Sequence, residues 1–228
     1  MIVLIDNEHE VGYQAPWGEK LMAARVRIKY RLEDMTDQPC LIVRYNRVTP
    51  ALLQQLGVKA IFISGNSANA DQYDPAEQAG MVAALRTRAW PVFGFCGGMQ
   101  VLAASYGAPL APIGPLAPNE PDPHPEFAPG HQKEFGYSPV QVIKSHPLLA
   151  GVGAAPIFRH AHSWEVKQVP PGFSLYASTA VTPIQLIIHD TLPLVGTQFH
   201  PEYWTDEYPA GQQLIENFCQ WVGLTAIP

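Results

Sequence analysis

One cysteine of this 228-residue chain stands where a nucleophile is expected. Residues 91–95 are a short apolar run that begins with proline, and residues 99–104 resume apolar side chains at helical spacing. Between them Cys96 lies among three glycines, which let a backbone turn sharply. A strand, a tight turn and a helix with the nucleophile at the turn form a nucleophile elbow. The helix N-terminus favours a thiolate there, although a buried core cysteine is the alternative interpretation.

A catalytic thiol needs a general base, and the base needs an acceptor that orients its ring. His200 ends a predicted strand and has Glu202 two residues later, across a proline. Residues at i and i+2 of an extended segment point to the same side. Glu202 can therefore hold one ring nitrogen of His200 while the other nitrogen faces the thiol. Glu165 and Asp190 are the other carboxylates considered for this orienting role.

Two further histidines, His160 and His162, alternate along one predicted strand, so at least one of them is expected to point toward a ligand. The chain has only three cysteines, which are far apart, and this count predicts neither a disulfide framework nor a metal knuckle. Cys40 and Cys219 are interpreted as core residues. We therefore predict no metal, no cofactor and a reducing, cytoplasmic location.

Two short motifs bring the candidate residues together. Residues 94–100 read Gly-Phe-Cys-Gly-Gly-Met-Gln, and residues 198–202 read Gln-Phe-His-Pro-Glu. In this order the motifs resemble those of the class I, triad-type glutamine amidotransferases, and the resemblance extends from Met1 to Trp221. It implies a flavodoxin-like parallel sheet. It also implies hydrolysis of the glutamine side-chain amide, through a γ-glutamyl thioester, to glutamate and ammonia.

The resemblance assigns a role to each candidate residue. Cys96 is the nucleophile, His200 the acid and base, and Glu202 the group that orients the histidine. The oxyanion is expected to bind the backbone N–H of Gly97 and an N–H of the loop after the third strand, at Asn66. The substrate-binding residues implied by the family pattern are Gly65, Gln100, Ser163 and Trp164.

The loop after the third strand departs from the family pattern. The family loop reads Ser-Gly-Gly-Pro-Gly, whereas residues 64–67 read Ser-Gly-Asn-Ser. Asparagine tolerates positive φ better than other non-glycine residues, so Asn66 is expected to present its N–H as glycine would. This loop is where we expect a partner to control the enzyme, with weak glutamine hydrolysis by the isolated chain.

Strand and helix signals alternate along the first half of the chain. Long apolar strands in such an alternation favour a parallel α/β sheet covered by helices on both faces. The loop of residues 64–67 and Cys96 both follow strands, so they are expected to share a site at the carboxyl edge. Short alternating runs in the C-terminal half predict a smaller mixed or antiparallel layer. We expect one domain, residues 1–228, with no internal repeat.

Two segments have more than one interpretation. The helix predicted for residues 19–33 has two apolar stripes with Arg25 and Lys29 between them, which fits a wide buried arc with snorkelling basic stems or an added contact surface. Residues 112–129 hold seven prolines, within an insertion of about 112–131. A loop of this length is usually a lid or a disordered flap.

Composition narrows the function classes. The net charge of −6 argues against a nucleic-acid partner, and no apolar run is long enough to span a membrane.

Because no synthetase segment follows the last predicted helix, residues 208–222, we expect the ammonia to reach a synthetase partner. Two alternatives differ from this interpretation. One is a γ-glutamyl peptide or amine hydrolase with the same triad. The other is a catalytically silent binding module, which the intact triad disfavours.

Overall fold

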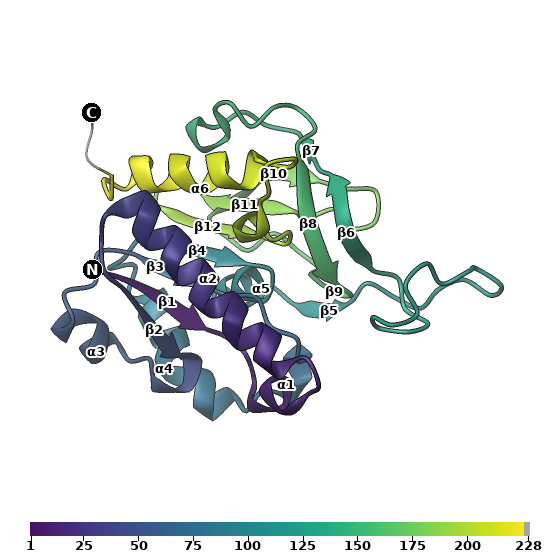
Figure 1. Ribbon diagram of the computed structural model, residues 1–228, viewed down its shortest axis with the longest axis horizontal. Helices are drawn as coiled ribbons and strands as arrows, with labels where there is room; N and C mark the ends of the chain where they lie inside the picture. Colours follow the sequence, from purple (N-terminus) through teal and green to yellow (C-terminus); the bar gives the residue numbers. More distant parts are fainter. Residues whose placement is uncertain (226–228) are drawn as a thin grey trace.

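The computed structural model describes residues 1–225 and has an eight-stranded sheet at its centre (Figure 1). The strand order is β2-β1-β3-β4-β12-β11-β10-β7, with the first five strands parallel and the last three paired antiparallel to their neighbours. The strands are β1 Ile2–Asp6, β2 Cys40–Arg44, β3 Ile61–Ile63, β4 Val92–Phe95, β7 Gln141–Val142, β10 Phe173–Ser178, β11 Leu186–His189 and β12 Leu194–Thr197. The parallel part has the flavodoxin-like order, which confirms the predicted fold class.

Helices cover both faces of the sheet, because the strands bury side chains on both sides (Figure 1). Ile2 and Leu4 pack with α2 and α6, while Val3 and Ile5 pack with α3, α4 and α5. The helices are α1 Glu10–Gln14, α2 Gly18–Thr36, α3 Pro50–Gln55, α4 Pro75–Arg86, α5 Gly97–Ser105 and α6 Ala210–Trp221, with 3₁₀ turns η1 Tyr45–Arg47, η2 Ala70–Gln72, η3 Pro147–Leu149 and η4 Pro201–Tyr203. Within residues 1–225, no helix combines the length and apolarity that crossing a membrane requires.

Helices α3 and α4 each begin with a capping side chain followed by a proline. Thr49 accepts a hydrogen bond from the N–H of Leu52 and is followed by Pro50. Asp74 caps α4 in the same way and is followed by Pro75. These caps satisfy N–H groups that the helix itself leaves free, and proline fits the first helical position.

Helix α2 buries only one of its two apolar stripes. Ile28 and Leu32 pack against the sheet, whereas Met22 and Tyr30 on the second stripe are 52% and 57% exposed. The interpretation of both stripes as one wide buried arc is therefore wrong. Arg25 lies between the stripes but is only 5% exposed, and its guanidinium points inward to polar partners.

Two small antiparallel sheets form the predicted second layer. They pair β5 Leu110–Pro112 with β9 Trp164–Val166, and β6 Glu134–Pro139 with β8 Ile157–His162. The pairing of β5 with β9 sets Pro112 opposite Trp164. The proline-rich insertion therefore begins directly beside a predicted substrate-binding residue.

The proline-rich insertion folds around one lysine. Residues 113–133 contain no helix or strand and extend as a long excursion from the body (Figure 1). The Lys133 ammonium lies 2.8 Å from Asp122 and donates to the carbonyls of His124 and Ala128 at 2.8 and 3.0 Å. Because these contacts come from the loop itself, the insertion has a defined conformation without regular secondary structure.

Candidate active site

Cys96 occupies a strained turn between β4 and α5. Its backbone has φ 49° and ψ −106°, a conformation that non-glycine residues rarely adopt and that is often found at functional sites. Its N–H donates to the carbonyl of Thr197 on β12 at 2.7 Å. A Cβ at Gly98 would lie 2.4 Å from the Ile63 carbonyl oxygen, so only glycine lets α5 approach β3 this closely. The geometry is that of the predicted elbow.

His200 and Glu202 follow β12 and form an ion pair. His200 Nδ1 lies 2.8 Å from Glu202 Oε1, and the Glu202 side chain is almost fully buried. Helix α2 contacts this segment through Arg31, which donates to the carbonyls of Glu202 at 2.7 Å and Trp204 at 3.1 Å. The His200 N–H also donates to the Arg159 carbonyl on β8, at 2.8 Å.

The two other carboxylates considered for the orienting role lie elsewhere. Glu165 pairs with Lys167 at 2.5 Å, and Asp190 accepts a hydrogen bond from the Ser174 hydroxyl at 2.7 Å. Neither contacts His200 among the residues that the structure describes. Glu202 is therefore the carboxylate in position to orient this ring.

The thiol, the imidazole and the loop after β3 meet at one point. A Cβ built on Gly65 would lie 2.7 Å from His200 Cε1 and 3.4 Å from Cys96 Cβ. The three residues lie at the carboxyl ends of β3, β4 and β12, which are neighbours in the sheet. Parallel sheets bind their ligands at this edge, as predicted.

The electrostatic environment of His200 favours its charged form. Burial works against the charge, but Glu202 and Cys96 outweigh it and raise the pKa of His200 to about 10. Near neutral pH the ring is therefore an imidazolium next to the sulfur. A protonated imidazole in this position stabilises a thiolate and can later deliver its proton to a leaving group.

This raised pKa predicts that stability falls at alkaline pH. Up to about pH 10 the folded state keeps a proton on His200 that the unfolded state releases above pH 6.5, but below about pH 8.5 the unfolded chain also holds a thiol proton that the Cys96 thiolate has given up. The folded state therefore binds one more proton between about pH 8.5 and pH 10. One extra bound proton lowers the free energy of unfolding by up to about 1.4 kcal/mol for each pH unit. Urea unfolding at several pH values should show this decline, and His200→Ala should remove most of it. An equal decline in His200→Ala would contradict the assignment.

The two predicted oxyanion donors lie close together beside the elbow. The Asn66 nitrogen is 3.2 Å from the position of a Cβ on Gly97. Within residues 1–225, neither the Asn66 N–H nor the Gly97 N–H has a hydrogen-bond acceptor. Asn66 is not among the described residues with positive φ, so its N–H is not presented through the conformation that asparagine tolerates well.

Gln100 and Trp164 are also brought together. The Gln100 amide donates to the Trp164 carbonyl at 3.0 Å and to Gln198 Oε1 at 3.1 Å. The Ser163 carbonyl accepts from the N–H of Ile113 at 2.8 Å. A cavity of about 170 Å³ has Asn66, Gly97 and Gln100 in its lining, whereas Ser163 and Trp164 are not part of that lining.

Sequence reasoning missed a buried residue at the thiol. Gln198 is fully buried, and its amide donates to Cys96 Sγ at 3.5 Å. Gln198 lies two positions before His200 in the motif of residues 198–202, and this was the sequence signal that could have identified it. Through Gln100 it links the thiol to the Trp164 backbone. Gln198 therefore couples the Cys96 thiol to the segment predicted to hold the substrate.

His160 and His162 face a different partner from the one expected. Both are buried against Glu134, and His162 Nε2 lies 3.0 Å from Glu134 Oε2. Burial lowers the pKa of His160 to about 4, so this ring is neutral. Among residues 1–225, these three form the one group with the spacing of metal ligands, within 4.8 Å of one another. A hydrogen on His162 Nε2 would by itself explain the 3.0 Å contact with Glu134, so this spacing does not require a metal ion.

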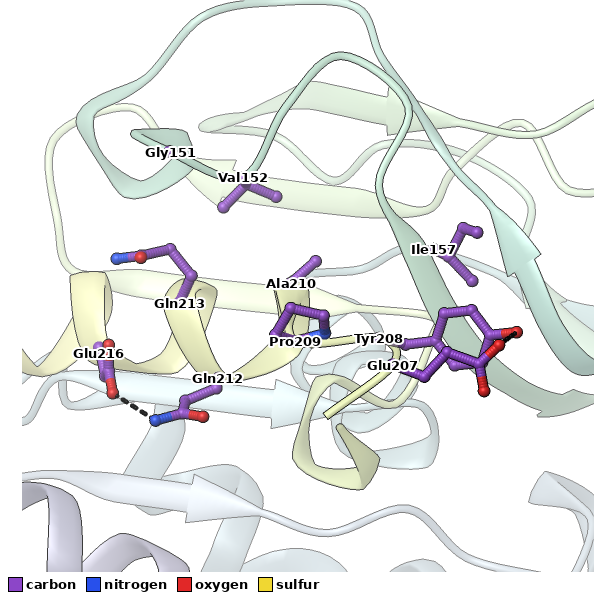
Figure 2. Close-up of a pocket in the computed structure, with 10 residues that line it drawn as sticks. All are labelled: Gly151, Val152, Ile157, Glu207, Tyr208, Pro209, Ala210, Gln212, Gln213 and Glu216. Atoms are coloured by element: carbon purple, nitrogen blue, oxygen red, sulfur yellow. Dashed lines mark hydrogen bonds between the residues drawn. The ribbon is translucent and has the colours of Figure 1, made fainter. Parts of the chain in front are cut away.

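A larger cavity, of about 460 Å³, lies over α6 (Figure 2). Its lining includes Ile157, Tyr208 and side chains of α6 such as Gln213 and Glu216, and it contains none of the predicted site residues. The size of this cavity therefore does not identify the reactive site. The predicted catalytic side chains lie at the elbow instead.

Comparison with known families decides the assignment of the chain. The model of the family described as glutamine amidotransferase class-I matches residues 28–221, and this stretch includes Cys96, His200 and Glu202. The chain belongs to the class-I glutamine amidotransferase family. Its membership confirms the resemblance and the enzyme class that the two motifs predict.

Several relatives of this amidotransferase chain are named as GMP synthases. It is 30% identical over 179 residues to the glutamine-hydrolysing GMP synthase of Thermomicrobium roseum, covering 78% of this chain and 29% of that protein. It is 30% identical over 133 residues to one subunit of the glutamine-hydrolysing GMP synthase of Methanocaldococcus jannaschii, covering 58% of this chain and 61% of that protein. The chain thus spans less than two thirds of the length of these two relatives.

Solved structures support the fold. A protein of Thermoplasma acidophilum, described as one subunit of GMP synthase, superposes with a TM-score of 0.72 at 23% identity, covering 98% of this chain and 92% of that one. The glutaminase domain of CTPS from Trypanosoma brucei, solved with bound acivicin, gives a TM-score of 0.65 at 16% identity, covering 100% and 96%. At these identities the likeness shows a shared amidotransferase fold.

Proposed function

We propose that this chain hydrolyses the side-chain amide of glutamine to glutamate and ammonia, with Cys96, His200 and Glu202 as its triad. The observation that supports this best is the strained turn at Cys96 next to the 2.8 Å ion pair of His200 and Glu202. A thiol, an imidazole and an orienting carboxylate are the parts that nucleophilic acyl transfer requires. Membership of the amidotransferase family makes glutamine the expected acyl donor.

The first half-reaction forms a thioester. The Cys96 thiolate attacks the amide carbon of glutamine, and the carbonyl oxygen becomes an oxyanion. The N–H groups of Asn66 and Gly97 are the proposed donors to this charge, a role supported by the Asn66 nitrogen lying 3.2 Å from the position of a Cβ on Gly97. His200 donates its proton to the leaving nitrogen, ammonia departs, and a γ-glutamyl thioester remains on Cys96.

The second half-reaction releases glutamate. His200, now neutral, takes a proton from water, and the hydroxide attacks the thioester through the same oxyanion site. Expulsion of the Cys96 thiolate gives the γ-carboxylic acid, which releases its proton to solvent and leaves as glutamate. His200 remains as the imidazolium that formed when it took the proton from water. Glu202 keeps the ring oriented through both proton transfers and stabilises its charged form.

The ammonia is proposed to serve a partner. Relatives named as one subunit of the glutamine-hydrolysing GMP synthase suggest that this chain is the glutaminase component of such a synthase. The acceptor of the ammonia would then be a substrate bound to the synthetase component. Affinity capture of the chain from its native cells should recover a synthetase, and repeated recovery of no such enzyme would oppose this part of the proposal.

A γ-glutamyl peptide or amine hydrolase is the second candidate. The observation that favours it is the proline-rich insertion, because Pro112 pairs with Trp164 and the Ile113 N–H binds the Ser163 carbonyl. An insertion anchored at the substrate-binding segment can reshape the pocket for a larger leaving group. The same triad would perform either reaction.

Steady-state rates on the purified chain separate the two candidates. Glutamine and a panel of γ-glutamyl amines and peptides are compared under identical conditions. We expect glutamine to have the highest kcat/KM of the set. A high kcat/KM for a γ-glutamyl peptide, with glutamine a poor substrate, would establish the second candidate instead.

The close approach of Gly65 to the triad gives a further prediction. In Gly65→Ala the new methyl group would lie 2.7 Å from His200 Cε1, so the imidazole must move. A displacement of about 1 Å at a reacting group can cost roughly 10²-fold in rate. We expect kcat for glutamine to fall by about this factor. Thermal unfolding serves as the control, and unchanged kcat in a folded variant would contradict the close approach of Gly65 to His200.

A further inference from the structure

The loop of residues 64–67 lacks the second glycine and the proline of the family pattern, yet it is surrounded by buried charges. Asp6 and Glu8 lie at the end of β1 and just beyond it, and Arg25 lies on α2. These residues are 5%, 1% and 5% exposed. Charges are buried only when they are paired or hydrogen-bonded, so the contacts of these three side chains show what they hold in place.

Arg25 fixes the peptide unit between Gly65 and Asn66. Its Nε donates to Asp6 Oδ1 at 2.8 Å, and its Nη2 donates to the Gly65 carbonyl oxygen at 2.8 Å. In a planar trans peptide, the carbonyl and the following N–H point in opposite directions. With the Gly65 carbonyl on Arg25, the Asn66 N–H points away from Arg25, and its nitrogen lies on the side of Gly97.

Glu8 holds the other side of Asn66. Its carboxylate accepts the Ser67 N–H at 2.8 and 3.1 Å and the Ser67 hydroxyl at 3.1 Å. Arg25 Nη2 lies 3.6 Å from Glu8 Oε2, so an ion pair connects the contacts on the two sides of Asn66. Burial works against the charge on Arg25, but Asp6 outweighs it and raises the pKa of Arg25, which keeps the guanidinium charged.

We propose that Arg25 and Glu8 form a charge clamp that positions the Asn66 N–H for the oxyanion of the tetrahedral intermediate. The clamp rests on the proposed glutamine hydrolysis and gives the loop the stiffness that glycine and proline supply in the family pattern. A flipped peptide would turn the Gly65 carbonyl toward the thiol and leave a buried guanidinium N–H without its acceptor. On this proposal the oxyanion donor is in place before any partner binds, which differs from the partner control of this loop that the sequence led us to expect.

Substitutions of Arg25 and Glu8 test the clamp. Arg25→Met removes the donor to the Gly65 carbonyl, and Arg25→Lys keeps the charge but cannot donate to Asp6 and Gly65 from one planar guanidinium. Glu8→Gln keeps the shape of the side chain that accepts from Ser67 but removes its charge. Arg27→Met, on the exposed side of the same helix, is the matched control. For each variant we measure kcat and KM for glutamine, thermal unfolding, and the rate at which iodoacetamide alkylates Cys96, a reaction that needs no oxyanion donor.

The clamp predicts a specific pattern. Arg25→Met should lose about 10²–10³ in kcat, as expected when one oxyanion donor is misplaced, with KM and alkylation within a few-fold of wild type. Arg25→Lys should recover part of the rate, and Arg27→Met should match wild type. If Arg25→Met does not fold, Arg25→Lys and Glu8→Gln test the clamp in its place. For these variants too, the clamp predicts a loss in kcat with KM nearly unchanged.

The outcomes also separate the clamp from the proposed function. A folded wild-type chain that hydrolyses no glutamine would refute the function itself. An active wild type with an unchanged kcat in Arg25→Met would overturn the clamp alone. So would a parallel loss of kcat, substrate affinity and alkylation rate, because that pattern indicates a general structural role.

Discussion

Cys96→Ser is expected to lose glutamine hydrolysis by a factor on the order of 10⁴ or more. The serine hydroxyl is a far weaker nucleophile than a thiolate held beside an imidazolium, and the elbow offers no other group to attack the amide. The substitution replaces one sulfur by oxygen at a residue 4% exposed, so the fold should persist. Initial rates on glutamine and a thermal unfolding curve measure both effects.

Labelling with a glutamine-like diazoketone gives the matching control within one molecule. The wild-type chain should incorporate label at Cys96 and at neither of its other cysteines. Burial raises the pKa of Cys40 to about 11 and that of Cys219 to about 12, so both thiols stay protonated and unreactive near neutral pH. Label on Cys40 or Cys219, with Cys96 unmodified, would refute the assignment of the nucleophile.

His200→Ala is expected to lower turnover by about 10⁴-fold, because proton transfer is needed in both half-reactions. Glu202→Gln keeps the shape of the side chain but removes its charge, so a smaller loss, of roughly 10²-fold, is expected. Since the two side chains act through one 2.8 Å contact, the double variant should be little worse than His200→Ala. kcat values for the three variants test this non-additivity.

Additive losses in that cycle would show that Glu202 acts independently of the histidine. Full activity in Glu202→Gln would be more damaging, because the structure offers no replacement carboxylate at His200 among residues 1–225. The alternatives weighed from sequence, Glu165 and Asp190, are both held by other partners.

The elbow and the positions of Cys96, His200 and Glu202 could be predicted because local patterns determine them. A glycine-rich turn between an apolar strand and a helix fixes the place of Cys96, and the i, i+2 spacing fixes Glu202 against His200. The order of parallel strands then follows from strand–helix alternation, which brings the loop after β3 beside the elbow. Each of these inferences needs only neighbouring residues and the rules of parallel sheets.

The residues that hold the site could not be predicted in this way. The 100° periodicity of α2 places Arg25 between two apolar stripes. It does not determine whether the side chain extends outward to solvent or turns inward to Gly65. That choice depends on Asp6 and Glu8, which reach the helix only through tertiary contact. The orientation of the Asn66 peptide has the same origin, and it is reached without the positive φ that asparagine tolerates.

The most direct test of the proposed mechanism is to trap the acyl-enzyme. The chain is mixed with glutamine, quenched in acid within the first turnovers, digested and analysed by mass spectrometry. We expect one glutamyl group, attached to the peptide that contains Cys96, and none in Cys96→Ser. Glutamine turnover with no adduct on Cys96, or with the adduct on another residue, would contradict the mechanism.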